Sequence, residues 1–182
     1  MTAATILTLD PAEAAEQRAG LVDLLVDAVE GGASVNFVLP MTREKAERWW
    51  DGALADHARG GRVIIAALDG DRICGSVQLI PAGQENQPFR ADIAKLLVHR
   101  RARRRGLGAA LMGAAEAEAL RLGRTLLTLD TETGSDGERL YHRLGWTMFG
   151  EVPGYATRAD GRERARCSFF YKDLASPLTP RP

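Results

Sequence analysis

One segment of the sequence most constrains how this chain folds. In it, a strand-like apolar run is followed by a basic turn, and two glycines then begin a helix. The apolar run ends at Val98, five of the six residues from Arg100 to Arg105 are arginine, and Gly106 and Gly108 open the helix. The first N–H groups of a helix have no partner within the helix, and the helix dipole favours negative charge beside them. Because glycine lets the backbone approach a ligand closely, the segment predicts a cradle for a pyrophosphate group.

The same segment also suggests a nucleic-acid patch, a dinucleotide-binding turn or a P-loop. The arginines suggest a nucleic-acid or targeting patch, but the 182-residue chain balances 24 Lys+Arg against 24 Asp+Glu and lacks the basic excess of a dedicated nucleic-acid binder. A dinucleotide-binding turn requires a third glycine where Leu111 stands, and a P-loop requires a Gly-Lys-[Ser/Thr] sequence that does not follow here. The structural alternative is a solvated basic loop that binds nothing.

Composition points to one ordinary domain. Hydrophobic residues make up 45% and charged residues 26% of the chain, as in typical globular proteins. We expect a domain over residues 1–175 and a loose proline-rich tail over residues 176–182. No apolar run approaches the roughly 20 residues of a membrane span, and Cys74 and Cys167 have neither disulfide-framework nor metal-ligand spacing. We therefore expect a cytoplasmic protein with no metal, no nucleic-acid partner and no membrane partner.

Hydrophobic periodicity and turn residues predict an α/β chain. Helices are expected from Asp10 to about Gly31, from Thr42 to about His57, and over residues 106–122 and 135–144. Strands are expected over residues 5–9, 63–68, 73–80, 90–98, 125–130, 146–152 and 165–172, with a long loop over 153–163. This order contains antiparallel hairpins and no regular βαβ alternation, so it predicts a mixed six- to seven-stranded sheet with flanking helices.

Two blocks of the chain resemble the GNAT N-acetyltransferase superfamily. Arg103-x-x-Gly106-x-Gly108 is similar to the family's acyl-CoA signature, [Gln/Arg]-x-x-Gly-x-[Gly/Ala], and the helix that ends in Tyr141-x-x-Leu-Gly-Trp is similar to its second block. The order of elements matches from about residue 5 to residue 172. The resemblance implies the GNAT fold with a splayed central strand pair, acetyl-CoA (coenzyme A) as the cofactor, and direct transfer of an acetyl group to an amine.

The resemblance also implies which residues hold coenzyme A. The strand before the basic turn would present backbone N–H groups to the thioester, and the turn would hold the diphosphate. Gly134 and Gly137 stand where the family often has Asn and Ala, which removes a side-chain group that would contact the pantetheine arm. The implied coenzyme A contacts are Leu96, Leu97, Val98, Arg103, Arg104, Arg105, Gly106, Leu107, Gly108, Ala109, Ser135 and Tyr141.

Acetyl transfer needs a base for the amine, donors for the oxyanion and an acid for the departing thiolate. Tyr141 is the candidate acid, and the alternative is a tyrosine that only packs beside its neighbours. Asp92 lies 11 residues before Arg103, the spacing at which the histone-acetyltransferase branch of the superfamily carries its base. Asp130 ends the neighbouring strand, where open α/β sheets bind ligands, and is an equal candidate for the base.

Residues 31–35, 129–132 and 150–155 are similar to tabtoxin-resistance-type acetyltransferases, which acetylate the free amine of a small toxic β-lactam amino acid. The resemblance implies an acceptor that is the primary amine of a small amino-acid-like molecule, and a role in antibiotic or toxin resistance. For assembly, a homodimer is one option. The acceptor contacts are expected at Ser34, Asn36, Phe37, Glu132 and Tyr155. Three alternatives stay open: a protein or peptide N-acetyltransferase, a non-catalytic acyl-CoA-binding sensor, and a dinucleotide-binding oxidoreductase.

Overall fold

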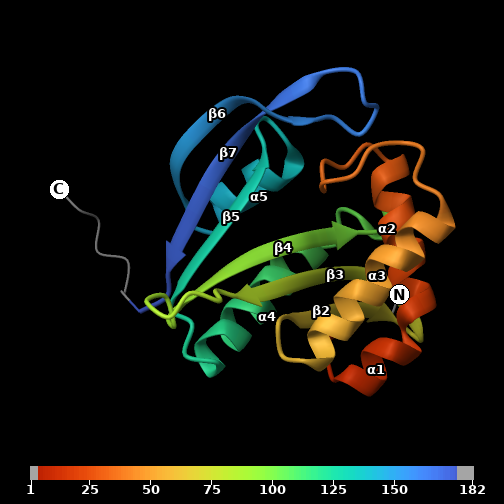
Figure 1. Cartoon of the computed structure of the whole chain (residues 1–182), viewed down its shortest axis with the longest axis horizontal. Helices are drawn as coiled ribbons and strands as arrows, with labels where there is room; N and C mark the ends of the chain where they lie inside the picture. The colour runs from red at the N-terminus through yellow and green to blue at the C-terminus, as the bar shows by residue number, and fades with distance from the viewer. Residues whose placement is uncertain (1–3, 176–182) are drawn as a thin grey trace.

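Within the described residues 4–175 of this computed structural model, seven strands form one sheet in the order β1-β2-β3-β4-β5-β7-β6 (Figure 1). Only β4 and β5 run parallel in that described sheet, and the other neighbouring strands are antiparallel. The strands are β1 (Thr5–Leu9), β2 (Val63–Asp69), β3 (Arg72–Pro81), β4 (Arg90–Val98), β5 (Leu126–Glu132), β6 (Thr147–Thr157) and β7 (Arg164–Asp173). The predicted mixed sheet is confirmed, and the expected tail over residues 176–182 lies outside the described residues.

Helices cover both faces of the sheet. They are α1 (Pro11–Glu16), α2 (Arg18–Glu30), α3 (Arg43–Ala58), α4 (Leu107–Arg121) and α5 (Asp136–Arg143), with the 3₁₀ turn η1 (Arg100–Ala102) before α4. Helices α1–α3 pack on one face of β1–β4, whereas α4 and α5 lie on the other face (Figure 1). Along β2, Ile64 packs toward α2 and α3 while its neighbour Ile65 packs toward α4. Because side chains alternate along a strand, covering both faces explains the continuous apolar run over residues 63–68.

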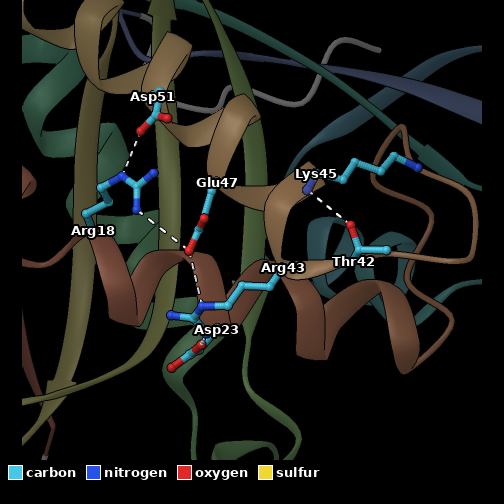
Figure 2. A network of polar contacts seen from close by, with 7 residues as sticks. All are labelled: Arg18, Asp23, Thr42, Arg43, Lys45, Glu47 and Asp51. Atoms are coloured by element: carbon cyan, nitrogen blue, oxygen red, sulfur yellow. Dashed lines mark hydrogen bonds and ion pairs between the residues drawn. The ribbon is translucent and has the colours of Figure 1, made fainter.

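Exposed charged side chains link α2 to α3 (Figure 2). Arg18 of α2 lies 2.7 Å from the Asp51 carboxylate of α3, and Glu47 lies 3.9 Å from Arg18 and 3.1 Å from Arg43. Arg43 also pairs with Asp23 of α2. Exposed ion pairs contribute little to stability, so the buried apolar faces of the two helices hold them together.

The predicted start of the first helix is confirmed, but its predicted length is wrong. Asp10 caps α1: its Oδ1 accepts the N–H groups of Ala12 and Glu13 at 2.8 Å each, and the Glu13 carboxylate accepts the Asp10 N–H at 2.8 Å. The chain then breaks at Gln17 and continues as α2. Apolar periodicity does not reveal this break, because buried residues of both helices join one cluster.

The predicted loop over residues 153–163 is wrong in its first half. Strand β6 continues to Thr157, so Tyr155 lies in a strand and the turn to β7 spans only residues 158–163. Pro153 and Gly154 suggest a strand end. β6 is an edge strand, however, where a proline need not remove a ladder hydrogen bond, and the irregular register between Val152 and Ala156 absorbs both residues.

Candidate functional site

The central parallel pair of strands separates soon after it begins. Residues Arg90 to Asp92 of β4 pair with Leu126 to Thr128 of β5, and no later pairing follows in the described chain although both strands continue. Figure 1 shows β4 and β5 diverging from this point. The β5-facing backbone groups of residues 93–98 are left without a strand partner, which is costly inside a sheet unless another extended molecule pairs with them. The expected splayed pair is thus present.

A bulge in β4 lies beside this gap. Ala94 pairs with Gln78 and Leu97 with Ser76, so that Lys95 and Leu96 together oppose a single residue of β3. Lys95 has a φ of 51°, the left-handed region that side chains other than glycine rarely adopt. Sequence reasoning missed Lys95, although a lysine within the apolar second half of β4, residues 93–98, was a signal that could have found it.

The turn after β4 forms an open cradle at the start of α4. Gly106 has a φ of 79° and precedes the helix without any side-chain cap. In residues 4–175, no acceptor is present for the N–H groups of Leu107, Gly108 and Ala109, and the first helical bond runs from Ala110 N–H to Gly106 O at 3.1 Å. Three free N–H groups at a helix N-terminus fit the diphosphate of coenzyme A.

The arginines of this turn have different surroundings. Arg103 donates from Nε to the Val98 carbonyl at 3.3 Å, and Arg105 pairs with Asp69 at 3.0 Å. Arg104, with a φ of 60°, makes no hydrogen bond or ion pair to another described residue. Arg104 is therefore the arginine of the three whose guanidinium has no hydrogen-bond or ion-pair partner among the described residues to release before it binds an anion, and Arg103 contacts only a neutral carbonyl.

A buried carboxylate of α2 anchors the turn. Asp27 accepts the Arg100 N–H at 2.9 Å and the Arg100 Nε at 2.8 Å. Burial alone would raise the pKa of Asp27, but these hydrogen bonds and the nearby charges of His99 and Arg100 lower the pKa below its ordinary value. Sequence reasoning missed Asp27 because a single acid in an amphipathic helix resembles a surface residue.

The two candidate bases differ in their surroundings. Asp92 is held by the Arg90 guanidinium at 2.6 Å and accepts a hydrogen bond from the Thr128 hydroxyl. Asp130 lies two residues beyond Thr128 on the same face of β5 and forms no ion pair with another described residue. Asp130 is exposed along the strand, but the surrounding protein partly removes its carboxylate from water and so raises its pKa. The Lys95 charge opposes this shift of the pKa, and the Asp92 charge adds to it.

Tyr141 lies on the opposite face of the sheet from Asp130. Its ring packs 6.0 Å from the ring of Trp146 and 5.9 Å from that of Phe170, within the cluster on the α4 side. Burial raises the pKa of Tyr141 well above its ordinary value, and the charge of Asp130 adds to the shift. The hydroxyl is therefore protonated at neutral pH and lies within electrostatic reach of Asp130.

The two glycines that depart from the family pattern have local structural reasons at the start of α5. A Cβ on Gly137 would lie 3.1 Å from the Thr131 hydroxyl and 3.5 Å from the Tyr141 ring, and Gly134 has a φ of 79°. The Ser135 hydroxyl caps α5 by accepting the Glu138 N–H at 3.1 Å. Ser135 thus has a structural role. Its expected contact with coenzyme A stays a prediction.

The expected acceptor residues are only partly brought together. Asn36 and Phe37 line an open cavity of about 290 Å³ together with Lys45, Ala156 and Thr157. Ser34 lies in the same loop, half-buried, but does not line this cavity. A larger cavity of about 570 Å³ lies at the other end of the sheet, around the ends of α3 and α4 and away from the splayed strands.

The other two expected acceptor residues have partners of their own. Glu132 pairs with Arg158 of the β6–β7 turn at 3.1 Å. Tyr155 is 53% exposed on β6, and its ring contacts Phe169 at 5.0 Å. The loop that carries Phe37 is joined to the same turn, because the Leu39 N–H donates to the Ala159 carbonyl at 2.7 Å. These two segments bridge one side of the splayed strands.

The cysteines do not resemble nucleophiles. Burial, together with the charges of Asp130 and Glu132, raises the pKa of Cys167 to about 11, and burial raises the pKa of Cys74 as well.

Over residues 4–175, no cluster of three His, Cys, Asp or Glu side chains has a geometry suited to a metal ion. The helices in that part of the chain are too short or too polar to cross a bilayer.

Comparison with known proteins agrees with this geometry. Residues 15–146 match the family model described as the acetyltransferase (GNAT) family. An N-acetyltransferase from the hisH-hisA intergenic region of Azospirillum brasilense is 34% identical over 132 residues, which cover 71% of this chain and 76% of that protein.

Two solved structures show the same fold. The structure of yncA from Salmonella typhimurium with its cofactor acetyl-CoA has a TM-score of 0.75 at 19% identity and covers 99% of each chain. A ribosomal-protein-alanine N-acetyltransferase from Brucella melitensis has a TM-score of 0.76 at 20% identity, covering 93% of this chain and 99% of that one. With its splayed strands, its open helix N-terminus and these matches, the chain belongs to the GNAT family of acetyl-CoA-dependent N-acetyltransferases.

Proposed function

We propose that this N-acetyltransferase acts on the primary amine of a small amino-acid-like molecule and transfers the acetyl group directly, without a covalent enzyme intermediate. The observation that carries the proposal is the arrangement across the β4–β5 gap. The free N–H groups of α4 and the Tyr141 ring lie on one face, and Asp130 points to the other. An acyl donor and an amine would then meet in the gap from opposite faces.

The donor side is assigned to the turn and to β4. The N–H groups of Leu107, Gly108 and Ala109 would hold the diphosphate, with Arg104 adding charge. Bound acetyl-CoA supplies an acetyl thioester that an amine can attack. The β5-facing backbone of residues 93–98, which has no strand partner, would pair with the pantetheine arm and donate to the thioester carbonyl.

Asp130 is proposed as the base and Tyr141 as the acid. An ammonium has a pKa of about 10 and must lose a proton before it attacks. A carboxylate with a raised pKa accepts that proton more readily than an ordinary aspartate, and Asp130 has no ion-pair partner among the described residues. Asp92 is held by Arg90 and Thr128, so we assign it to positioning these strands. Tyr141 keeps its proton on the donor face, and we assign it to protonate the departing thiolate.

The volume of the cavity beside Phe37 suits a small acceptor. The cavity at Phe37 measures about 290 Å³, near the lower end of the ~300–1,000 Å³ of small-molecule pockets. The hydrogen bond from Leu39 to Ala159 ties the Phe37 loop to the β6–β7 turn, and this link would limit access for a folded protein. Acetylation of a toxic amino-acid-like compound, and hence resistance to it, is the role we propose.

The setting and assembly form part of the same proposal. Two buried cysteines without a disulfide suit the reducing cytoplasm. A homodimer is supported by exposed aromatic side chains on β6, where Phe149 is 62% and Tyr155 53% exposed. Sedimentation velocity at several concentrations tests the dimer, and a single monomer boundary at the highest concentration would contradict it.

A thiol-release assay with acetyl-CoA tests the acceptor class. The panel contains amino acids, β-lactam amino acids, polyamines and peptides with free N-termini. We expect turnover with small amino-acid-like amines and little with peptides. Turnover with peptides alone would replace the proposal by a peptide N-acetyltransferase. Tight binding of acetyl-CoA without turnover of any amine would identify a sensor instead.

A further inference from the structure

Lys95 lies at the splayed strands with a charge that no neighbour neutralises. The chain has three lysines. Lys172 pairs with Glu116 at 2.8 Å, and Lys45 donates to the Val38 carbonyl at 2.9 Å. Lys95 forms neither an ion pair nor a hydrogen bond through its side chain to another residue of the described range 4–175. A half-buried ammonium without an anionic partner is unfavourable unless a ligand supplies that anion.

Two aromatic rings hold the ammonium group in position. Lys95 Nζ lies 5.6 Å from the centroid of the Phe37 ring and 5.4 Å from that of Trp49. Rings at this distance attract a cation but supply no hydrogen-bond acceptor. Phe37 also lines the cavity of about 290 Å³, so the ammonium group borders that cavity. The left-handed backbone of Lys95 in the β4 bulge directs the side chain toward these rings.

Lys95 and Asp130 carry opposite charges that act on each other without forming an ion pair. Asp130 and Arg62 are the charged groups whose fields act on Lys95. Burial lowers the pKa of Lys95, Arg62 lowers it further, and Asp130 opposes the shift. Asp130 lies beyond ion-pair distance, and Arg62 is engaged by Asp56 at 2.8 Å and by Gln78 at 2.8 Å. A cation and an anion held apart in this way complement a molecule that carries both charges.

We propose that Lys95 binds the acidic group of the acceptor, so that the acceptor is an amino acid or a close analogue with an anionic group near its amine. The inference rests on the proposed function and makes it narrower. The amine lies toward Asp130, where it loses its proton, and the acidic group accepts hydrogen bonds from Lys95. Simple amines and amino-acid esters, which lack the acidic group, leave Lys95 without a partner.

The first test compares acceptors and needs no variant. L-amino acids, their methyl esters and the corresponding decarboxylated amines are assayed with acetyl-CoA at saturation. A hydrogen bond between charged groups predicts that the free acids exceed the esters and amines roughly tenfold to a hundredfold in kcat/KM. Equal values for acids and esters would overturn the inference while leaving the proposed function intact. Turnover of neither these compounds nor the β-lactam amino acids would overturn both.

The second test removes the charge. For the free acids, Lys95→Met is expected to raise KM roughly tenfold or more with little change in kcat, while KM for the methyl esters stays the same. Lys95→Arg, which keeps a cation, restores most of the preference for acids. Arg48→Met, which removes an exposed cation of α3 that does not line the cavity, is expected to keep the preference. If Lys95 were only structural, Lys95→Met would change kcat/KM for acids and esters alike. If Lys95 were the base, Lys95→Met would lower kcat for both. Either result overturns the inference. If Lys95→Met does not fold, the comparison of acids with esters on the native chain decides.

Discussion

Tyr141 and Asp130 lie on opposite faces of the sheet, beside the gap that β4 and β5 leave when they diverge. The Tyr141 ring belongs to the apolar cluster on the α4 side, whereas Asp130 follows Thr128 on the α3 side, and the charge of Asp130 raises the pKa of Tyr141. In an unbroken sheet, backbone and side chains would separate these groups. Here a group that keeps its proton and a group that can accept one lie on the two sides of one opening.

Tyr141→Phe tests the acid. The ring keeps its packing against Trp146 and Phe170, so we expect the melting temperature to stay the same. Loss of the hydroxyl should lower kcat roughly 100-fold to 10,000-fold with little change in KM, as is usual for removal of a general acid. Steady-state kinetics with calorimetric melting separates the two effects. An unchanged kcat would show that the tyrosine only fills the core.

Asp130→Asn tests the base through the pH dependence of kcat/KM. Only the ionised carboxylate accepts a proton, so activity should fall as the pH drops through the pKa of Asp130, which lies above the ordinary aspartate value. The variant should lose most of its activity and the acidic limb of its pH profile. Asp92→Asn is the matched control, and we expect that variant to keep the limb. A limb that persists in Asp130→Asn and disappears in Asp92→Asn would reverse the assignment.

The same substitution should not reduce stability at neutral pH. A carboxyl group whose pKa is higher in the folded chain than in the unfolded chain binds its proton more tightly when folded, so its ionised form opposes folding above that pKa. Replacing Asp130 by a neutral amide removes this opposition. Urea unfolding at pH 7 is therefore expected to give an equal or larger free energy of unfolding for Asp130→Asn. A clear loss of stability would mean that the Asp130 carboxylate has a structural partner.

Asp27→Asn tests the anchor of the basic turn. The amide cannot replace the charged hydrogen bonds to the Arg100 N–H and guanidinium, so we expect a loss of about 1–3 kcal/mol in the free energy of unfolding. The affinity for coenzyme A should fall as the turn loosens. Chemical denaturation and calorimetric titration measure the two effects. Native affinity in a destabilised variant would show that the turn does not depend on this anchor.

The contribution of Asp27 should also disappear in acid. The folded pKa of Asp27 is lower than the unfolded value, so its stabilisation is complete above the ordinary aspartate pKa. It is lost as the pH falls through the folded pKa. The stability difference between the native chain and Asp27→Asn should be constant near neutrality and shrink below a pH of about 4. A difference that shrinks near neutral pH would assign the titration to another group.

Gly106→Ala tests the backbone of the anion cradle. A Cβ at this position meets no atom within 4 Å, so the change acts through the φ of 79° and not through a steric clash. A left-handed conformation for alanine costs about 1–2 kcal/mol, and we expect weaker binding of coenzyme A as the turn shifts. Gly113→Ala, also without neighbours but inside α4, should be neutral or stabilising. Equal affinities for both variants would contradict the role assigned to Gly106.

Local sequence signals predicted the parts of the molecule that depend on local chemistry. Asp10 with Glu13 marked the start of α1, and the glycines at 106 and 108 marked the start of α4. Lys95 and Asp27 were missed because their roles depend on partners distant in the chain, the rings of Phe37 and Trp49 and the turn at Arg100. A bulge leaves no clear mark in the sequence of its own strand, because it is defined by the register against the neighbouring strand.

The claim on which the other assignments depend is that the first N–H groups of α4 bind the diphosphate of coenzyme A. Amide resonances of a ¹⁵N-labelled chain, followed during titration with coenzyme A, test it directly. We expect the largest shifts at Leu107, Gly108 and Ala109, and only small ones around His57 at the other end of the sheet. Saturable binding that leaves the amides of residues 107–109 unshifted would contradict the account.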